Sequence, residues 1–235
     1  MTVRGPLSTV VRAVLGALLL ALFHAPARAQ TIESPFSFID KRQAGGLFVG
    51  YRSAGTGRFG YGPGPGPIFG AVYDLEVAGP LGLDVVTTIN PTTRDVINPD
   101  LPEGARVTGS ADVLLTSIEA LFRFSLTGRR TWHGLSPHLS AGGGMAFESK
   151  GAQPDDERVL VDDRFSFGNS FLTTMGGGVR WIPGQRLTFR TDFGFSLWRL
   201  ETPRGFADPD RAFEGVQERE WVGVPTVRAM FSLRF

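Results

Sequence analysis

The chain has 235 residues, with 24 lysine and arginine, 23 aspartate and glutamate, and no cysteine. This charge balance excludes the strongly basic domain expected of a nucleic-acid-binding protein. The lack of cysteine excludes disulfides, thiolate metal sites and a lipid-modified N-terminal cysteine.

Residues 1–29 have the organisation of a secretory signal peptide. Arg4 and Arg12 give a positive start, residues 13–23 form an apolar run, and Ala27-Arg28-Ala29 is a small-residue cleavage site. The run has about half of the roughly 20 apolar residues that a membrane-spanning helix needs, which favours cleavage over an anchor. Three of the basic residues and none of the acidic ones lie in this leader. We therefore expect an exported chain with two more acidic than basic side chains.

After a short lead-in at residues 30–44, which we expect in the periplasm, apolar and polar residues alternate. This is the pattern of strands with two unlike faces. The clearest case is residues 187–197, where leucine, phenylalanine and threonine alternate with threonine, arginine, aspartate, glycine and serine. The eight expected strands are residues 46–52, 68–77, 81–89, 114–126, 135–147, 165–181, 187–197 and 227–235. Several approach the 9 to 11 residues that a tilted membrane strand needs.

The connections between these strands alternate between short and long. The short ones are residues 79–80, 128–134 and 183–185, and the long ones are residues 53–67, 90–110, 148–164 and 201–220. Such alternation is typical of an up-and-down barrel with short periplasmic turns and long extracellular loops. The sequence therefore predicts an all-β chain whose residues 45–235 form an eight-stranded antiparallel transmembrane β-barrel with four long extracellular loops.

A soluble, lipocalin-like barrel is the alternative, and three features argue against it. The only lysines, Lys41 and Lys150, lie outside the expected strands, whereas a solvated exterior normally carries several. The polar faces are rich in glycine, serine and threonine, which suit a crowded barrel interior. We expect Trp181, Trp198 and Trp221, near strand ends, to form interfacial girdles. These features favour a barrel in the bacterial outer membrane, in contact with lipid and lipopolysaccharide.

The charged residues of the polar faces share one enclosed space in such a barrel. By this register they are Arg52, Asp74, Glu76, Asp84, Glu119, Arg123, Arg180, Arg190, Asp192, Arg228 and Arg234. Because unpaired charges are costly in a narrow interior, we predict a network of arginine–carboxylate pairs that blocks an open channel. A water-filled lumen with hydrated charges is the alternative.

The last strand alternates throughout, and its apolar positions are expected to face lipid and to carry the membrane-insertion signal. These positions are Val227, Ala229, Phe231, Leu233 and Phe235. With the leader, the eight strands and the alternating connections, this strand resembles the small outer-membrane barrels grouped with the OmpA transmembrane domain and OmpX. Residues 175–181, followed by a Pro-Gly turn, also resemble hairpins common in bacterial outer-membrane β-barrel domains. The resemblance implies assembly by the barrel-assembly machinery, here without a periplasmic peptidoglycan-binding domain.

Catalysis and ligand binding have weak support in the sequence. His138, with Ser136 and Ser140 on the same strand face, would permit a Ser-His pair, so a lipid A-modifying acyl hydrolase or transferase is the second hypothesis. The third and fourth long loops are acidic without an EF-hand spacing, which favours solvated loops over a metal site. The expectation is a non-enzymatic barrel without cofactor or metal, with a structural role or a surface role involving an extracellular partner through its loops.

Overall fold

The computed structural model describes residues 34–211 and 213–235. The expected signal peptide lies outside the described residues. The strands are β1 (Phe36–Phe38), β2 (Gln43–Arg52), β3 (Gly66–Ala78), β4 (Leu81–Ile97), β5 (Val107–Ser125), β6 (Arg130–Trp132), β7 (Leu135–Glu148), β8 (Asn169–Trp181), β9 (Leu187–Glu201) and β10 (Arg219–Arg234). Four short 3-10 helices follow in the connections: η1 (Pro154–Arg158), η2 (Val161–Asp163), η3 (Arg204–Ala207) and η4 (Pro209–Arg211).

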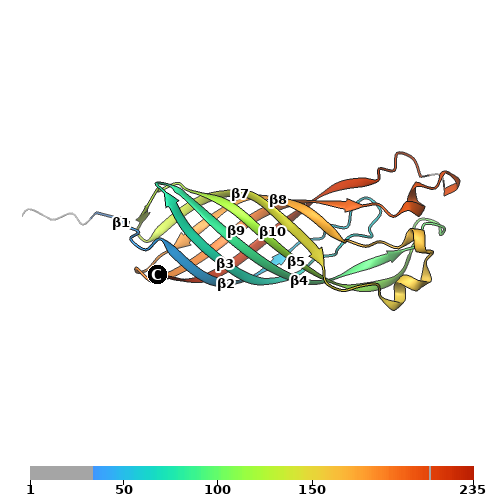
Figure 1. Cartoon of the computed structure of the whole chain (residues 1–235), viewed down its shortest axis with the longest axis horizontal. Coiled ribbons are helices and arrows are strands. Elements are labelled where there is room, and N and C mark those ends of the chain that lie inside the picture. Colours follow the sequence, from blue (N-terminus) through green and yellow to red (C-terminus); the bar gives the residue numbers. More distant parts are fainter. Residues whose placement is uncertain (1–33, 212) are drawn as a thin grey trace, which may run out of the picture. The chain divides into compact units, whose positions relative to one another are not determined.

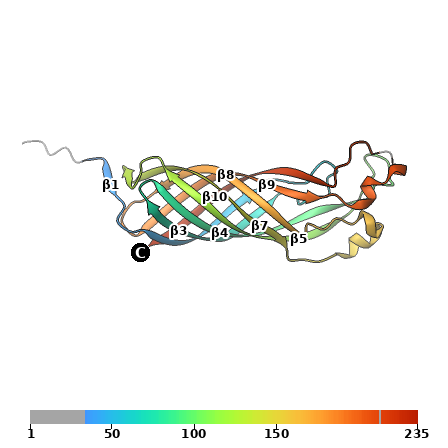
Figure 2. The ribbon, with the colours of Figure 1, turned by 45° about the horizontal axis from the view of Figure 1, so that its top comes forward.

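Eight of the strands form a closed ring. They pair antiparallel in the order β2-β3-β4-β5-β7-β8-β9-β10, and β10 pairs back onto β2 with Phe231 opposite Leu47 and Val227 opposite Tyr51. The strands cross the ring at a tilt (Figures 1 and 2). This confirms the predicted eight-stranded up-and-down architecture. Closure leaves the ring of eight strands without an unpaired edge, which a β-structure in a bilayer requires.

The period-two alternation of the strands separates the two faces of the barrel wall. Large apolar side chains such as Leu47, Phe122 and Phe193 are exposed on the outside, whereas arginines, carboxylates, serines and threonines are buried inside. Such an exterior is stable in hydrocarbon but costly in water. Within the described residues, no helix is long and apolar enough to span a membrane.

The two ends of the barrel differ. The connections β3–β4, β5–β7 and β8–β9 are at one end, here called the short-turn end, together with β1 and the C-terminus (Figure 1). The connections β2–β3, β4–β5, β7–β8 and β9–β10 gather at the other, here called the long-loop end. All four 3-10 helices lie in the last two of these loops.

Strands β4 and β5 are longer than the sequence pattern indicates. Their pairing continues from Pro91 opposite Leu114 to Ile97 opposite Val107, so that residues 98–106 alone connect them. The polar stretch at residues 92–95 has no clear alternation, but tertiary contacts hold it in the sheet. Val96 packs with Ala111 and with Val159 of the third long loop.

Strand β8 is shorter than expected, because residues 165–168 do not belong to it. Phe165 and Phe167 are buried among residues at the long-loop end of the barrel interior. The alternating spacing of these two phenylalanines therefore reflects the packing of a loop and not a strand.

Strands β1 and β6 form a small addition outside the ring. They pair antiparallel, with Phe36 opposite Trp132 and Phe38 opposite Arg130. The Arg129 guanidinium lies 4.7 Å from the centre of the Phe38 ring. The lead-in, to which the sequence assigns no structure, is thus partly ordered.

Candidate functional site: the barrel interior

The barrel interior is filled in three layers. The layer nearest the short turns, here called the turn-side network, consists of Asp74, Glu76, Asp84, Arg123, Arg180, Arg190, Asp192 and Arg234. The central layer holds Arg52, Glu119 and Arg228 beside buried apolar side chains. The layer at the long-loop end is a cluster of aromatic and aliphatic residues, here called the loop-side plug.

Arg123 and Arg190 connect the carboxylates of the turn-side network. Arg123 Nη1 donates to Asp74 at 2.9 Å and to Asp84, and its Nη2 donates to Glu76 at 3.0 Å. Arg190 Nη1 donates to Asp84 at 2.6 Å and to Asp74 at 3.2 Å. Its Nη2 lies 2.7 Å from an Asp192 oxygen. Each guanidinium thus contacts three carboxylates, which β3 and β4 supply to Arg123 and which β3, β4 and β9 supply to Arg190.

Arg180 and Arg234 complete this layer through Glu76. Arg180 Nη1 donates to Glu76 at 2.6 Å, and its Nη2 donates to the hydroxyls of Ser125 and Ser136 at 2.8 and 3.1 Å. Arg234 Nη2 lies 3.7 Å from Glu76 and donates to the Lys41 carbonyl at 2.6 Å. Four arginines thus face four carboxylates. This balance offsets the cost of burying each charge.

The central layer contains the other three predicted charged residues. Arg228 lies 3.8 Å from Glu119, which accepts a hydrogen bond from Thr174 at 2.7 Å. The Arg52 guanidinium lies 5.2 Å from the centre of the Trp198 ring. The eleven predicted residues are all buried, but they form two groups, eight in the turn-side network and three here.

An apolar group shares the central layer, and the sequence interpretation missed it. Its members are Phe48, Ile68, Val72, Val86, Leu121 and Met230. They occupy the same strand faces as the buried charges, where the sequence reads as a polar face interrupted by single apolar residues. These apolar residues at inward positions were the signal in the sequence that could have identified the group.

The loop-side plug is built from strand ends and from loops far apart in sequence. Its buried residues are Tyr61, Ile97, Val113, Leu115, Ala146, Phe165, Phe167, Leu172, Trp198, Leu200, Phe206 and Val224. Tyr61 stacks on Phe165 with ring centres 4.8 Å apart. Its phenol lies 3.2 Å from both Thr202 and Glu220. Burial raises the pKa of Tyr61 to about 12, and the nearby Glu220 carboxylate contributes in the same direction.

Trp198 belongs to this plug, so its expected place in an interfacial girdle is wrong. It is only 1% exposed, whereas Trp181 and Trp221 are 49% and 57% exposed on the outside. Trp198 lies on the inward-facing parity of β9, with Arg190 and Asp192. Its closeness to the strand end was a misleading signal, and its parity was the correct one.

Two loop carboxylates expected to be solvated are instead buried in ion pairs. Arg94 of β4 lies 2.7 Å from Asp156 of η1. Arg211 of η4 pairs with Asp163 of η2, and its Nε lies 2.9 Å from Asp100. The Asp163 hydrogen bond raises the pKa of the Arg211 guanidinium. These pairs connect the second, third and fourth long loops.

His138 lies inside the barrel. It is 2% exposed, and its Nε2 lies 3.1 Å from Asp192. The Ser136 hydroxyl accepts hydrogen bonds from Arg180 and from Thr127. Two residues of the hydrolase hypothesis, His138 and Ser136, are therefore in contact with the turn-side network. Within the described residues, no group of three or more histidine and carboxylate side chains is placed to hold a metal ion.

The apolar positions of the last strand lie on the outer face. Val227, Phe231, Leu233 and Phe235 are exposed, and the Phe235 amide donates to the Gln43 carbonyl at 2.9 Å. The alternate residues Arg228 and Arg234 are buried inside. Strand β10 closes the ring against β2, so these outward side chains lie at the seam.

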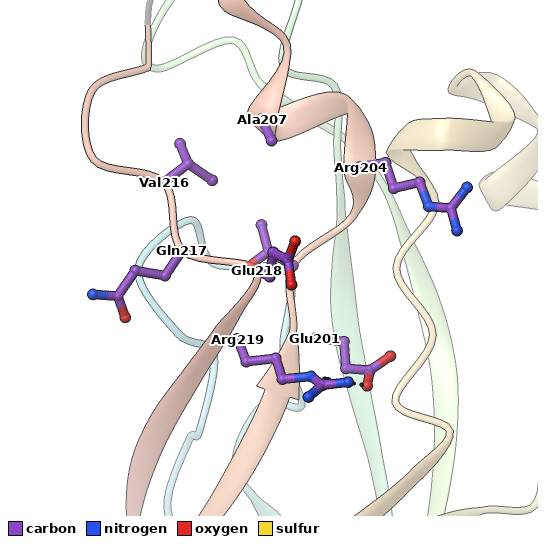
Figure 3. Close-up of a pocket in the computed structure, with 8 residues that line it drawn as sticks. Glu201, Arg204, Ala207, Val216, Gln217, Glu218 and Arg219 are labelled. Carbon is purple, nitrogen blue, oxygen red and sulfur yellow. Dashed lines mark ion pairs between the residues drawn. The ribbon is translucent and has the colours of Figure 1, made fainter.

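A surface pocket of about 310 Å³ lies between the two arms of the fourth long loop. It is lined by Glu201, Thr202, Arg204, Ala207, Val216, Gln217, Glu218 and Arg219. Figure 3 shows Arg219 and Glu201 pointing toward each other, and they form an exposed ion pair at 3.5 Å. The charged residues that line this pocket are all exposed, so nothing in its lining marks it as a binding site for a charged ligand.

A closed eight-stranded ring with an apolar exterior and a charged interior defines the class of transmembrane β-barrels of outer membranes. No protein-family model matches the sequence, and no curated protein sequence matches it.

Solved structures do match the fold. The outer membrane protein OprG from Pseudomonas aeruginosa aligns with a TM-score of 0.51 and 11% identity, over 83% of this chain and 97% of OprG. Neisserial surface protein A, NspA, aligns with a TM-score of 0.49 and 14% identity, over 86% of this chain and 98% of NspA. At such identities the likeness to OprG concerns the fold alone.

Proposed function

We propose that this protein is a closed, non-enzymatic barrel of the outer membrane, with a structural role or a role in surface contact. Its partners would be outer-membrane lipid and lipopolysaccharide, with the barrel-assembly machinery acting during biogenesis. The long-loop end would face outside, and the short-turn end with β1 would face the periplasm. An extracellular partner would contact the long loops.

The filling of the interior in three layers is the observation that carries this proposal. An eight-stranded barrel is just wide enough for its own side chains. Here the turn-side network, the central layer and the loop-side plug follow one another along the barrel. Opening a channel would require both breaking several buried ion pairs and displacing an aromatic cluster, and each change is costly.

Ordered loops support a surface role. The Arg58 guanidinium donates to the carbonyls of Glu214 and Gly215, and the Arg58 amide donates to Glu220 at 3.1 Å. With Arg94–Asp156 and Arg211–Asp163, these contacts tie the loops to one another. A surface ordered before binding loses less conformational entropy when a partner docks.

Planar-bilayer recording of the refolded barrel tests the closed interior. We expect no steady, large conductance, with a porin reconstituted in the same way as the positive control. Protection of the strands from protease would show that the barrel has inserted. Steady large channels from an inserted barrel would contradict the proposal.

Cysteine labelling tests the orientation. The chain has no native cysteine, and Gly151 in a long loop and Gly184 in a short turn both have open space around them. In intact cells we expect a membrane-impermeant maleimide to label Gly151→Cys and to leave Gly184→Cys unlabelled until the outer membrane is broken. The reverse pattern would show the opposite orientation.

A further inference from the structure

The central layer of the barrel holds more positive than negative charge. Arg52 and Arg228 are both buried there, and the carboxylate beside them is Glu119. The charged groups that act most strongly on Arg52 are Glu119 and Arg228. Glu119 is the ion-pair partner of Arg228. The turn-side network is balanced in itself, so it offers Arg52 no spare carboxylate.

Arg52 has no hydrogen-bond acceptor for two of its donors. It is 2% exposed, and among the described residues no atom accepts a hydrogen bond from its Nε or Nη2. Its guanidinium lies over Trp198, a contact that attracts a cation weakly and leaves the in-plane donors unused. Guanidinium stays charged in proteins, and a buried charge without a partner is strongly unfavourable.

Two neighbouring polar groups also lack a hydrogen-bond partner. Thr226 lies opposite Arg52 in the pairing of β10 with β2, and its hydroxyl has no hydrogen-bond partner among the described residues. Trp198 Nε1, on the ring beneath Arg52, has none either. Indole offers only a donor and a hydroxyl can serve as one. Arg52, Trp198 and Thr226 together therefore have more unpaired donors than acceptors, since the Thr226 hydroxyl is the one group of the three that can also accept.

We propose that Arg52, with Arg228, Trp198 and Thr226 beside it, forms a buried site for one small monovalent anion such as chloride. One negative charge balances the central layer, and a halide accepts hydrogen bonds from several directions. A water molecule would satisfy donors and leave the charge unbalanced. The apolar side chains of the same layer favour an ion without a hydration shell. The centre of the Phe48 ring, for example, lies 5.7 Å from the Arg228 guanidinium. The anion would be enclosed during folding, as part of the closed interior.

Bromide replacement in crystals of the complete barrel tests this site. We expect one anomalous peak inside the barrel, within hydrogen-bonding distance of the Arg52 guanidinium. Arg52→Met keeps the length of the side chain and removes the excess charge, so the peak should disappear. Arg219→Met, an exposed arginine, serves as the control and should keep it. An ordered water only, an adventitious ion only at surface arginines, or a peak retained in Arg52→Met would each overturn the proposal.

Chloride dependence of the unfolding midpoint gives a second readout in solution. At constant ionic strength, replacing gluconate by chloride should raise the midpoint of the wild-type chain, because the anion binds only the folded state. The shift should be lost in Arg52→Met. If that variant does not fold, Glu119→Gln increases the excess positive charge and should steepen the dependence on chloride. A midpoint that responds to chloride equally in all variants would contradict the site.

Discussion

Arg123 contacts three of the four carboxylates in the turn-side network, Asp74, Glu76 and Asp84. Its side chain is fully buried. Arg123 stabilises the fold mainly by balancing the charge of these carboxylates. A buried ion pair contributes little in itself, but removing one partner is costly.

Replacing Arg123 therefore gives a sharp prediction. Arg123→Met should lower the free energy of unfolding by about 3 to 5 kcal/mol, since it leaves the four buried carboxylates of this network with three arginines. Arg219→Met is the matched control, because its ion pair with Glu201 is exposed, and should cost at most about 1 kcal/mol. Reversible denaturant unfolding in lipid vesicles measures both. Equal losses would mean that the turn-side network is hydrated.

Tyr61 gives a prediction about pH. Its pKa is raised from 10.0 to about 12, so the folded state favours the neutral phenol. The resulting stability is fully present below about pH 10 and is lost as the pH rises toward about 12. Tyrosine labelled with ¹³C, with Tyr61→Phe for assignment, should show this shifted titration. A resonance that titrates near 10 would place Tyr61 in solvent.

Single residues also show what parity could and could not predict from the sequence. The inward parity placed Arg52, Arg123 and Asp192 inside the barrel, because alternation is a local property of a strand. It could not specify their partners, which depend on where eight strands meet across the ring. Trp198 shows a different limit: an aromatic residue near a strand end suits either a girdle or a plug, and its inward parity was the correct signal.

At the scale of elements, the strands were predictable where both faces were distinct and less so where tertiary contacts decided. Strands β7 and β9 begin at the predicted residues, Leu135 and Leu187. The extension of β4 to Ile97 depends on its pairing with β5 and on loop residues such as Asp156 and Val159. These contacts join parts of the chain that no local pattern connects.

The end of strand β10 is predicted to be needed for assembly of the barrel. Deleting Phe235 removes an exposed aromatic residue and the hydrogen bond from its amide to Gln43 at the seam with β2. We expect the shortened chain to be exported with its leader removed but to fail in barrel assembly. Phe235→Tyr keeps the aromatic ring and should assemble. Leader cleavage and protease resistance of the outer-membrane fraction separate the two steps, and full assembly of the deletion variant would refute the role of Phe235.

On the scale of the whole molecule, the barrel combines an apolar exterior with an interior of buried charged residues. The sequence predicted this combination from the rarity of lysine, the small polar residues and the inward charges. It did not predict the loop-side plug, because Tyr61, Phe165 and Phe206 come from three separate loops. The plug and the loop ion pairs make the long-loop end an ordered surface.

The most direct test of the account is cell fractionation combined with heat-modifiable gel mobility. A closed barrel in the outer membrane resists detergent until heated, because all of its strands pair with neighbours. We predict that the protein fractionates with the outer membrane and migrates faster in an unboiled sample than in a boiled one. A soluble periplasmic protein whose mobility does not change on boiling would contradict the account.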